Sequence, residues 1–139
     1  MAPLPDEVRA LLDGPNFAHV ATLMPDGAPH SVAVWAGLEG DRVVFFTQPE
    51  TRKARNLERD GRLAISLVDR ENPYRTARLR GHVAGVLEGD EAFEVIDRLS
   101  RKYTGRDFPM RRGVVFLVEV DRAASMNLPF RDEPDPLTA

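Results

Sequence analysis

Residues 45–67 read FFTQPETRKARNLERDGRLAISL, and this stretch decides the fold of the chain. The pattern passes from a strand, through a turn at Pro49, into a short helix and back into a strand. Proline cannot continue an interior strand. Thr51 is a typical N-cap, and Gly61 is a typical helix stop. The stretch therefore predicts a strand–helix–strand unit whose helix covers residues 51–60.

The helix of this unit carries cations at its start, where they oppose the helix dipole. Arg52 and Lys53 fall in the first turn, where unpaired backbone N–H groups already concentrate positive charge. Such a violation of a local rule is expected at a functional site, and a docked anion such as phosphate would turn the penalty into an attraction. The alternative is a solvated basic face balanced by Glu50, Glu58 and Asp60. This stretch alone leaves both interpretations open.

Length and composition predict one globular domain. The chain has 139 residues, 42% of them hydrophobic, and it contains no cysteine, which excludes disulfides and thiolate metal sites. No apolar run is long enough to span a membrane, and the N-terminus lacks a signal-peptide pattern, so we expect a cytoplasmic protein. The net charge of −3 disfavours general nucleic-acid binding, which needs a broad basic surface. A small anionic ligand fits the local basic cluster better.

Hydrophobic periodicity predicts a mainly β protein with short helices. The expected fold is a small, mostly antiparallel six-stranded β-barrel. A barrel of this size has a small core and would gain from oligomerisation. The predicted helices cover residues 5–13, 51–60 and 91–104, the last one capped by Asp90. The predicted strands cover residues 17–24, 30–38, 42–48, 62–69, 74–87 and 114–120.

The strand over residues 74–87 is long and alternates between an apolar face and a cationic face. Its two glycines, Gly81 and Gly85, permit a bulge or a sharp curl of the kind that barrels require. We expect the domain to cover residues 1–125 and residues 126–139, which are rich in proline and acids, to form an extended tail.

No catalytic motif of the nucleotide-binding or serine-hydrolase type is present. The chain lacks G-x-G-x-x-G, a P-loop and G-x-S-x-G. Its histidines, His19, His30 and His82, lack the spacing of metal ligands, so no metal site is predicted. If the protein is an enzyme, a cofactor supplies the reactive group. No catalytic residue is assigned.

Three motifs carry a resemblance to a known family. Thr47 to Leu57 reads T-x-x-x-T-R-K-x-x-N-L, Pro73 to Gly81 reads P-Y-R-x-x-x-x-R-G, and residues 21–35 read ATLMPDGAPHSVAVW. Together they resemble the split-barrel flavin and deazaflavin proteins related to pyridoxamine 5′-phosphate oxidase, and more narrowly the F420-dependent reductase branch. The resemblance covers most of residues 8–120. It implies the split β-barrel of FMN-binding proteins, a homodimer, and two equivalent cofactor sites at the subunit interface.

The resemblance also implies which residues hold the cofactor. Lys53 is the first choice for the cofactor phosphate. Trp35 either stacks near the ring system or belongs to the core or the dimer interface. Thr47 either bonds the cofactor linker or is an ordinary strand threonine. The partner subunit is expected to contribute the start of the strand at 74. The complete set of expected cofactor-binding residues is Val34, Trp35, Thr47, Arg52, Lys53, Asn56, Tyr74 and Arg75.

The second predicted strand favours one cofactor over another. FMN-dependent oxidases of this family carry basic residues in that strand and at its end, whereas residues 31–38 contain no cation. We therefore expect coenzyme F420, with reduced F420 passing a hydride to a small organic substrate. The alternatives are an FMN-dependent pyridoxamine 5′-phosphate oxidase-like enzyme and a non-catalytic protein that binds F420, flavin or haem.

Overall fold

Hydrophobic periodicity and turn residues place nine elements along the chain in the computed structural model, which describes residues 3–130. The first half follows the predictions within one or two residues. The elements are α1 (Asp6–Asp13), β1 (Phe17–Leu23), β2 (Pro29–Glu39), β3 (Arg42–Thr47), α2 (Arg52–Arg59), β4 (Arg62–Val68), β5 (Arg75–Leu87), α3 (Gly89–Thr104) and β6 (Val114–Asn127).

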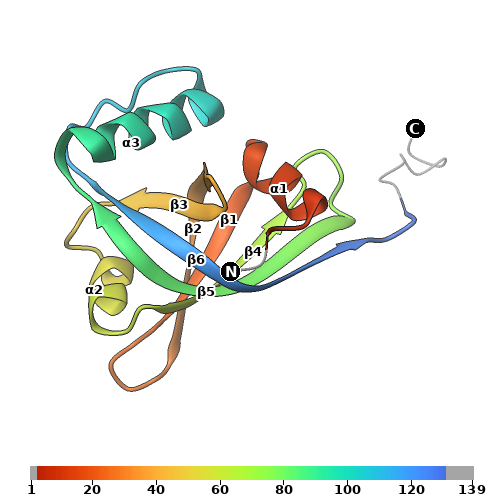
Figure 1. The fold of residues 1–139 in the computed structure, drawn as a ribbon, viewed down its shortest axis with the longest axis horizontal. Coiled ribbons are helices and arrows are strands. Elements are labelled where there is room, and N and C mark those ends of the chain that lie inside the picture. The colour runs from red at the N-terminus through yellow and green to blue at the C-terminus, as the bar shows by residue number, and fades with distance from the viewer. Residues whose placement is uncertain (1–2, 131–139) are drawn as a thin grey trace, which may run out of the picture.

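The six strands close into an antiparallel barrel in the order β1-β2-β3-β6-β5-β4 (Figure 1). Hairpins join β1 to β2 and β2 to β3, and α2 connects β3 to β4 across the barrel. Closure comes from β1 pairing with β4 and from β3 pairing with β6. The predicted six-stranded antiparallel barrel is confirmed. No helix in the described part of the chain is long and apolar enough to cross a membrane.

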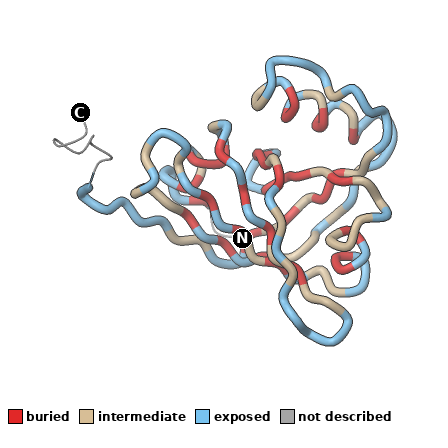
Figure 2. The backbone as a smooth tube through the Cα atoms, turned by 180° about the vertical axis from the view of Figure 1, so that it is seen from behind, coloured by how far each residue is buried: buried red, intermediate tan, exposed pale blue. Residues whose placement is uncertain are grey.

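Two hydrophobic cores lie on opposite faces of β3. The inner core fills the barrel and takes in Leu57 of α2 together with three leucine and valine side chains of α1. The outer core lies under α3, where Ile96 and Leu99 pack against Val44 and Val115. Figure 2 shows buried residues along the strands and on the inward side of α3. Because both faces of β3 are covered, Val43, Val44 and Phe45 are all fully buried.

The predicted bulge of β5 lies at its two glycines. The register between β5 and β6 shifts at Arg80/Gly81 and again at Val83/Gly85. A Cβ atom at Gly81 would stand 2.3 Å from the backbone oxygen of Glu119, so no larger residue fits there without backbone movement. The bulge bends β5 around the barrel.

Two predicted boundaries were wrong at the C-terminal half. Strand β6 runs to Asn127 rather than to residue 120, because residues 122–127 pair with β5 although they lack apolar alternation. Helix α3 begins at Gly89, and its N-cap is Glu88 without a side-chain bond, so Asp90 is not the cap. The expected tail at 126–139 therefore starts inside β6, and residues 131–139 lie outside the described part.

Candidate functional site

The start of α2 is held by hydroxyl groups. The N–H of Ala54 donates to Thr51 Oγ1 at 3.4 Å, so Thr51 is the N-cap as predicted. The Thr51 hydroxyl in turn donates to the carbonyl of Gln48 at 3.0 Å, and it lies 3.0 Å from Thr47 Oγ1. Thr47 is buried at the end of β3. The turn between β3 and α2 is thereby fixed, and the first turn of α2 presents cations with no acid beside them.

Lys53 lies in this first turn, where a partly buried cation destabilises the folded chain unless a partner or ligand compensates its charge. Its side chain is half-buried, and burial lowers the pKa of its ammonium group below the usual value. Within residues 3–130, no hydrogen bond or ion pair engages it. A partly desolvated cation without a partner at a helix start is the arrangement that an anionic ligand stabilises.

A hollow of about 300 Å³ opens beside Lys53 on the outer face of β1, β2 and β3. Apart from Lys53, every side chain around it is apolar. Four aromatic rings come from four separate segments: β1, β2, β3 and the loop after α3. We call this feature the aromatic hollow. It is lined by Phe17, Ala33, Val34, Trp35, Phe46, Lys53 and Phe108.

Trp35 is the centre of the aromatic cluster at this hollow. Its ring stacks on Tyr103 of α3, with centroids 5.3 Å apart and planes 10° apart. Phe46 and Phe108 meet it edge-on, at 6.0 Å and 6.2 Å. Tyr103 and Phe46 also belong to the packing between α3 and the barrel, so Trp35 is both a wall of the hollow and part of a packed cluster. The packing agrees with the interpretation of Trp35 as part of the core, and its stacking near a cofactor ring stays a prediction.

The backbone next to Trp35 is fixed by α3. Tyr103 Oη accepts from the Ala36 N–H at 3.2 Å and donates to the Asn16 carbonyl at 2.5 Å. Lys102 Nζ donates to the carbonyls of Ala36 and Leu12, at 2.6 Å and 2.9 Å. Burial lowers the pKa of Lys102 to about 8. These bonds tie α1, β2 and α3 together directly behind the hollow.

The structure separates the roles of the other α2 residues. Asn56 is fully buried, and its amide donates to Thr22 Oγ1 at 3.0 Å. Its Oδ1 accepts from Arg52 at 3.4 Å and from Arg59 at 3.3 Å. Arg59 also bonds the carbonyl of Leu23. Asn56 is therefore enclosed under α2, and Arg52 lies over it rather than in the hollow.

Tyr74 and Arg75 lie elsewhere. Arg75 is the first residue of β5, and Tyr74 precedes it in the turn after β4; this end of β5 lies on the opposite side of the barrel from α2 in Figure 1. Arg75 pairs with Asp69 at 3.0 Å, and the Tyr74 ring meets Phe130 at 5.7 Å. Within one chain, the hollow therefore brings together Val34, Trp35 and Lys53 of the expected site, with Thr47 supporting the turn.

Phe17, Phe46 and Phe108 were not among the expected site residues. Each looks like an ordinary strand or loop residue in the sequence, and their convergence depends on barrel closure and on the packing of α3. The described residues contain no group of three or more His, Asp or Glu side chains that could hold a metal ion.

Comparison with known proteins identifies the family. The sequence profile of pyridoxamine 5′-phosphate oxidase matches residues 4–125. The pyridoxine/pyridoxamine 5′-phosphate oxidase of Roseobacter denitrificans is 34% identical over 82 residues, which make up 58% of this chain and 40% of the enzyme. That of Vibrio vulnificus is 28% identical over 92 residues, or 66% of this chain and 41% of the enzyme. The chain thus spans about two fifths of the length of these relatives.

Solved structures show the same fold over more of the chain. A structure described as an F420 reductase has a TM-score of 0.74 and 27% identity, and the match covers 87% of this chain and 98% of that one. The conserved hypothetical protein Rv2991 of Mycobacterium tuberculosis has a TM-score of 0.77 and 22% identity, covering 99% and 96%. The profile match over most of the chain, together with the barrel that these structures share, shows that the chain belongs to the pyridoxamine 5′-phosphate oxidase family of split-barrel flavin and deazaflavin proteins.

Proposed function

We propose that this protein is an F420-dependent oxidoreductase that binds the deazaflavin in the aromatic hollow and reduces a small organic substrate. The observation that carries the proposal is Lys53, a half-buried cation without a partner among the described residues, at a helix start and beside aromatic rings. A cofactor with a phosphate and a planar ring matches both halves of this site. The F420 reductase among the similar structures supports the choice.

The residues present fit such a cofactor. Lys53 and the N–H groups at the start of α2 would hold the phosphate, with Arg52 free to turn from Asn56 toward it. Trp35, Phe46 and Phe108 would border the ring and keep water away from it. When bound, the reduced deazaflavin supplies the hydride. The chain itself would bind the cofactor, orient its ring and shield it from water.

We further propose that a second copy of the chain completes the site. The outer face of β1, β4 and β5, with the adjoining part of β6, is at least partly exposed, and small side chains lie among arginines at its centre, where a second copy could approach. A hollow of about 550 Å³ lies on this face. Two rows of side chains cross the centre of this face from strand to strand. One row is His19, Ser66, Arg78 and Ala124, and the row beside it is Ala21, Ala64, Arg80 and Arg122.

This face continues directly into the aromatic hollow. Phe17 is paired with Trp35 across β1 and β2, and it is 48% exposed, although it is a large apolar side chain. Exposed apolar rings at the edge of a flat face are typical of an interface. A second copy docked there would cover Phe17. We propose that it also brings its own Tyr74 and Arg75 to the hollow.

FMN is the alternative cofactor, and one observation favours it: the matched family profile and the curated relatives are pyridoxine/pyridoxamine 5′-phosphate oxidases. Against it, β2 carries no arginine or lysine along its eleven residues. F420 has a phosphodiester and suits the cations of α2 without help from β2. We expect F420 to bind more tightly than FMN.

Titration of the purified protein with F420 and with FMN decides between these cofactors. Binding is followed by cofactor fluorescence and by the emission of Trp35, the single tryptophan of the chain. FMN binding tighter than F420 by tenfold, about 1.4 kcal/mol, would reverse the ranking. A panel of small organic acceptors with reduced F420 then tests turnover. Tight F420 binding without turnover of any acceptor would favour a non-catalytic carrier.

A further inference from the structure

The loop over residues 105–113 carries one ring into the aromatic hollow. It joins α3 to β6 and contains no helix or strand, and most of its side chains are exposed. Phe108 is the exception. Its ring lies edge-on to Phe46 at 5.0 Å and to Trp35 at 6.2 Å. An exposed loop therefore supplies one wall of the hollow.

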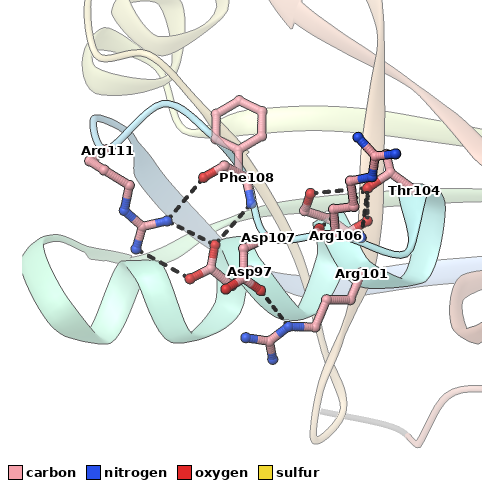
Figure 3. Close-up of polar contacts among 8 residues, drawn as sticks. Asp97, Arg101, Thr104, Arg106, Asp107, Phe108 and Arg111 are labelled. Atoms are coloured by element: carbon pink, nitrogen blue, oxygen red, sulfur yellow. Dashed lines mark hydrogen bonds and ion pairs between the residues drawn. The ribbon is translucent and has the colours of Figure 1, made fainter.

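Asp97 of α3 holds the backbone of this residue. The Phe108 N–H donates to Asp97 Oδ1 at 3.1 Å. The Arg111 guanidinium donates to both oxygens of the same carboxylate, at 3.0 Å and 3.2 Å. It also donates to the Phe108 carbonyl at 3.0 Å. Figure 3 shows the Phe108 ring pointing away from Asp97 while its backbone faces it. Both backbone groups of Phe108 thus depend on one ion pair.

This ion pair differs from the other contacts of the loop. The Asp97 side chain is only 14% exposed, and the Arg111 guanidinium lies 4.1 Å from the Phe93 ring centroid. The Arg111 side chain is itself 55% exposed, so the difference lies in the enclosed carboxylate and the two contacts that it accepts, which make this pair stronger than a surface pair with one contact. Asp107 in the same loop bonds Arg101, and both of those side chains are mostly exposed. Neither side chain of that second pair makes a hydrogen bond to Phe108.

We propose that Asp97 is a positioning residue for the aromatic hollow: it fixes Phe108 as a rigid wall, and that wall determines how tightly a planar ring ligand is held against Trp35. The inference rests on the proposed function for the nature of the ligand. A wall fixed before the ligand arrives lowers the ordering cost of binding. Without Asp97, Phe108 moves with an exposed loop and the hollow loses a side.

The first arm of the test needs no ligand. Acrylamide quenching of Trp35 fluorescence reports whether Phe108 still covers the tryptophan. Asp97→Ala, Arg111→Ala and Phe108→Ala are each expected to raise the quenching constant. Asp107→Ala is the matched control, because it removes a carboxylate next to Phe108 without removing a hydrogen bond to Phe108, and it should leave quenching unchanged. Thermal melts confirm that each variant is folded. Arg111→Ala keeps the test decisive if Asp97→Ala does not fold, since Arg111 is mostly exposed.

The second arm measures ring binding with two probes, F420 and riboflavin, the latter carrying a flavin ring without phosphate. Asp97→Ala and Phe108→Ala should each weaken both probes by about two- to tenfold, the range of one aromatic contact. The double variant should lose little more than either single one, because both changes remove the same wall. Asp107→Ala should match wild type.

Two results would overturn the inference. In the first, the quenching constants of Asp97→Ala and Arg111→Ala are no higher than that of Asp107→Ala. This would show that the ion pair does not position Phe108. Raised quenching with unchanged affinity for both probes would show that Phe108 is no wall for a ring. Wild type that binds neither probe would instead contradict the proposed function, while the quenching arm would still decide the role of Asp97.

Discussion

Tyr103 lies parallel to Trp35, with ring centroids 5.3 Å apart, and its hydroxyl bonds the backbone of two neighbouring segments. It accepts from the Ala36 N–H in β2 and donates to the Asn16 carbonyl ahead of β1. Helix α3 therefore does more than cover a core. It sets the position of Trp35 through the ring and the position of the adjacent backbone through the hydroxyl.

Lys102, the neighbour of Tyr103, predicts a specific pH dependence of stability. Burial lowers its pKa from 10.5 to about 8 in the folded protein. Between these values the unfolded chain binds more protons than the folded chain, so stability rises with pH. Below about pH 8 the full penalty of burying the charged amine is present. We expect the contribution of Lys102 to the free energy of unfolding, measured with urea over roughly pH 7 to 10, to increase as the pH rises.

Lys102→Met isolates the contribution of Lys102 from that of other titrating groups. The methionine keeps much of the apolar stem and cannot titrate. The difference in stability between wild type and Lys102→Met should shift in favour of wild type as pH rises through this window. A difference that stays constant with pH would show that the amine is not desolvated.

Gly81→Ala should be the most damaging conservative change in β5. The added Cβ atom would stand 2.3 Å from the Glu119 carbonyl oxygen, which is backbone and cannot turn aside. We expect a loss of about 1–3 kcal/mol or more in urea unfolding. Gly85→Ala is the control, because its Cβ atom meets only the end of the Leu117 side chain, at 3.4 Å. Similar losses for both variants would contradict a specific backbone contact at Gly81.

Asn56→Ala tests whether this residue supports the fold or the ligand. Its buried amide is bonded to Thr22, so the alanine leaves that hydroxyl unpaired and opens a void under α2. We expect stability to fall by about 1–3 kcal/mol. Arg52→Ala, which removes only one donor to Asn56, should cost less than about 1 kcal/mol. Thermal melts of both variants compare them, and an Asn56→Ala protein as stable as wild type would assign the amide a role outside the fold.

The sequence was informative wherever local chemistry decides structure. The N-cap at Thr51, the cations of the first turn of α2, and the bulge at the glycines of β5 all follow from residues close together in the chain. The resemblance to the family implied a cofactor site that includes Val34, Trp35 and Lys53. The aromatic hollow brings these three side chains together, and cofactor binding there stays a prediction.

The parts that the sequence did not predict depend on long-range contacts. Residues 122–127 lack apolar alternation and form strand because the long β5 offers them a pairing partner. Phe17 and Phe108 stand 91 positions apart in the sequence, and no local pattern places both beside Trp35. The enclosure of Asn56 is likewise not visible in the sequence, since a helical asparagine is more often exposed and its partner Thr22 lies in β1, with β2 and β3 between them.

Self-association through the outer face of β1, β4 and β5 is the next prediction. Sedimentation at micromolar concentration should report about twice the 15.5 kDa chain mass. Ser66→Arg adds a cation beside Arg78 at the centre of this face and should shift the protein toward monomer. Glu94→Arg, on the exposed side of α3, should not. A wild-type monomer under these conditions would rule out a site completed by a second copy.

Lys53→Ala tests the group on which the proposed function rests. A charge-assisted contact to phosphate contributes about 1.5–3 kcal/mol, so F420 should bind about ten- to a hundredfold more weakly at fixed salt. Part of this effect should fade as ionic strength rises, because a half-buried pair is screened. Folding should not suffer, since the change removes a partly desolvated cation from the first turn of a helix.

The control for Lys53→Ala is Arg55→Ala, which removes an exposed cation two residues further along α2. Arg59 is unsuitable, because it bonds Asn56 and the Leu23 carbonyl and its loss would disturb the helix. Arg55→Ala should lose less than about threefold in F420 affinity, the level expected of an exposed charge near an anion. Both variants are compared with wild type by F420 titration at two salt concentrations and by thermal melting. Equal F420 affinities for Lys53→Ala and Arg55→Ala, with both folded, would mean that the cations of α2 form a solvated face and that no single one of them holds a phosphate.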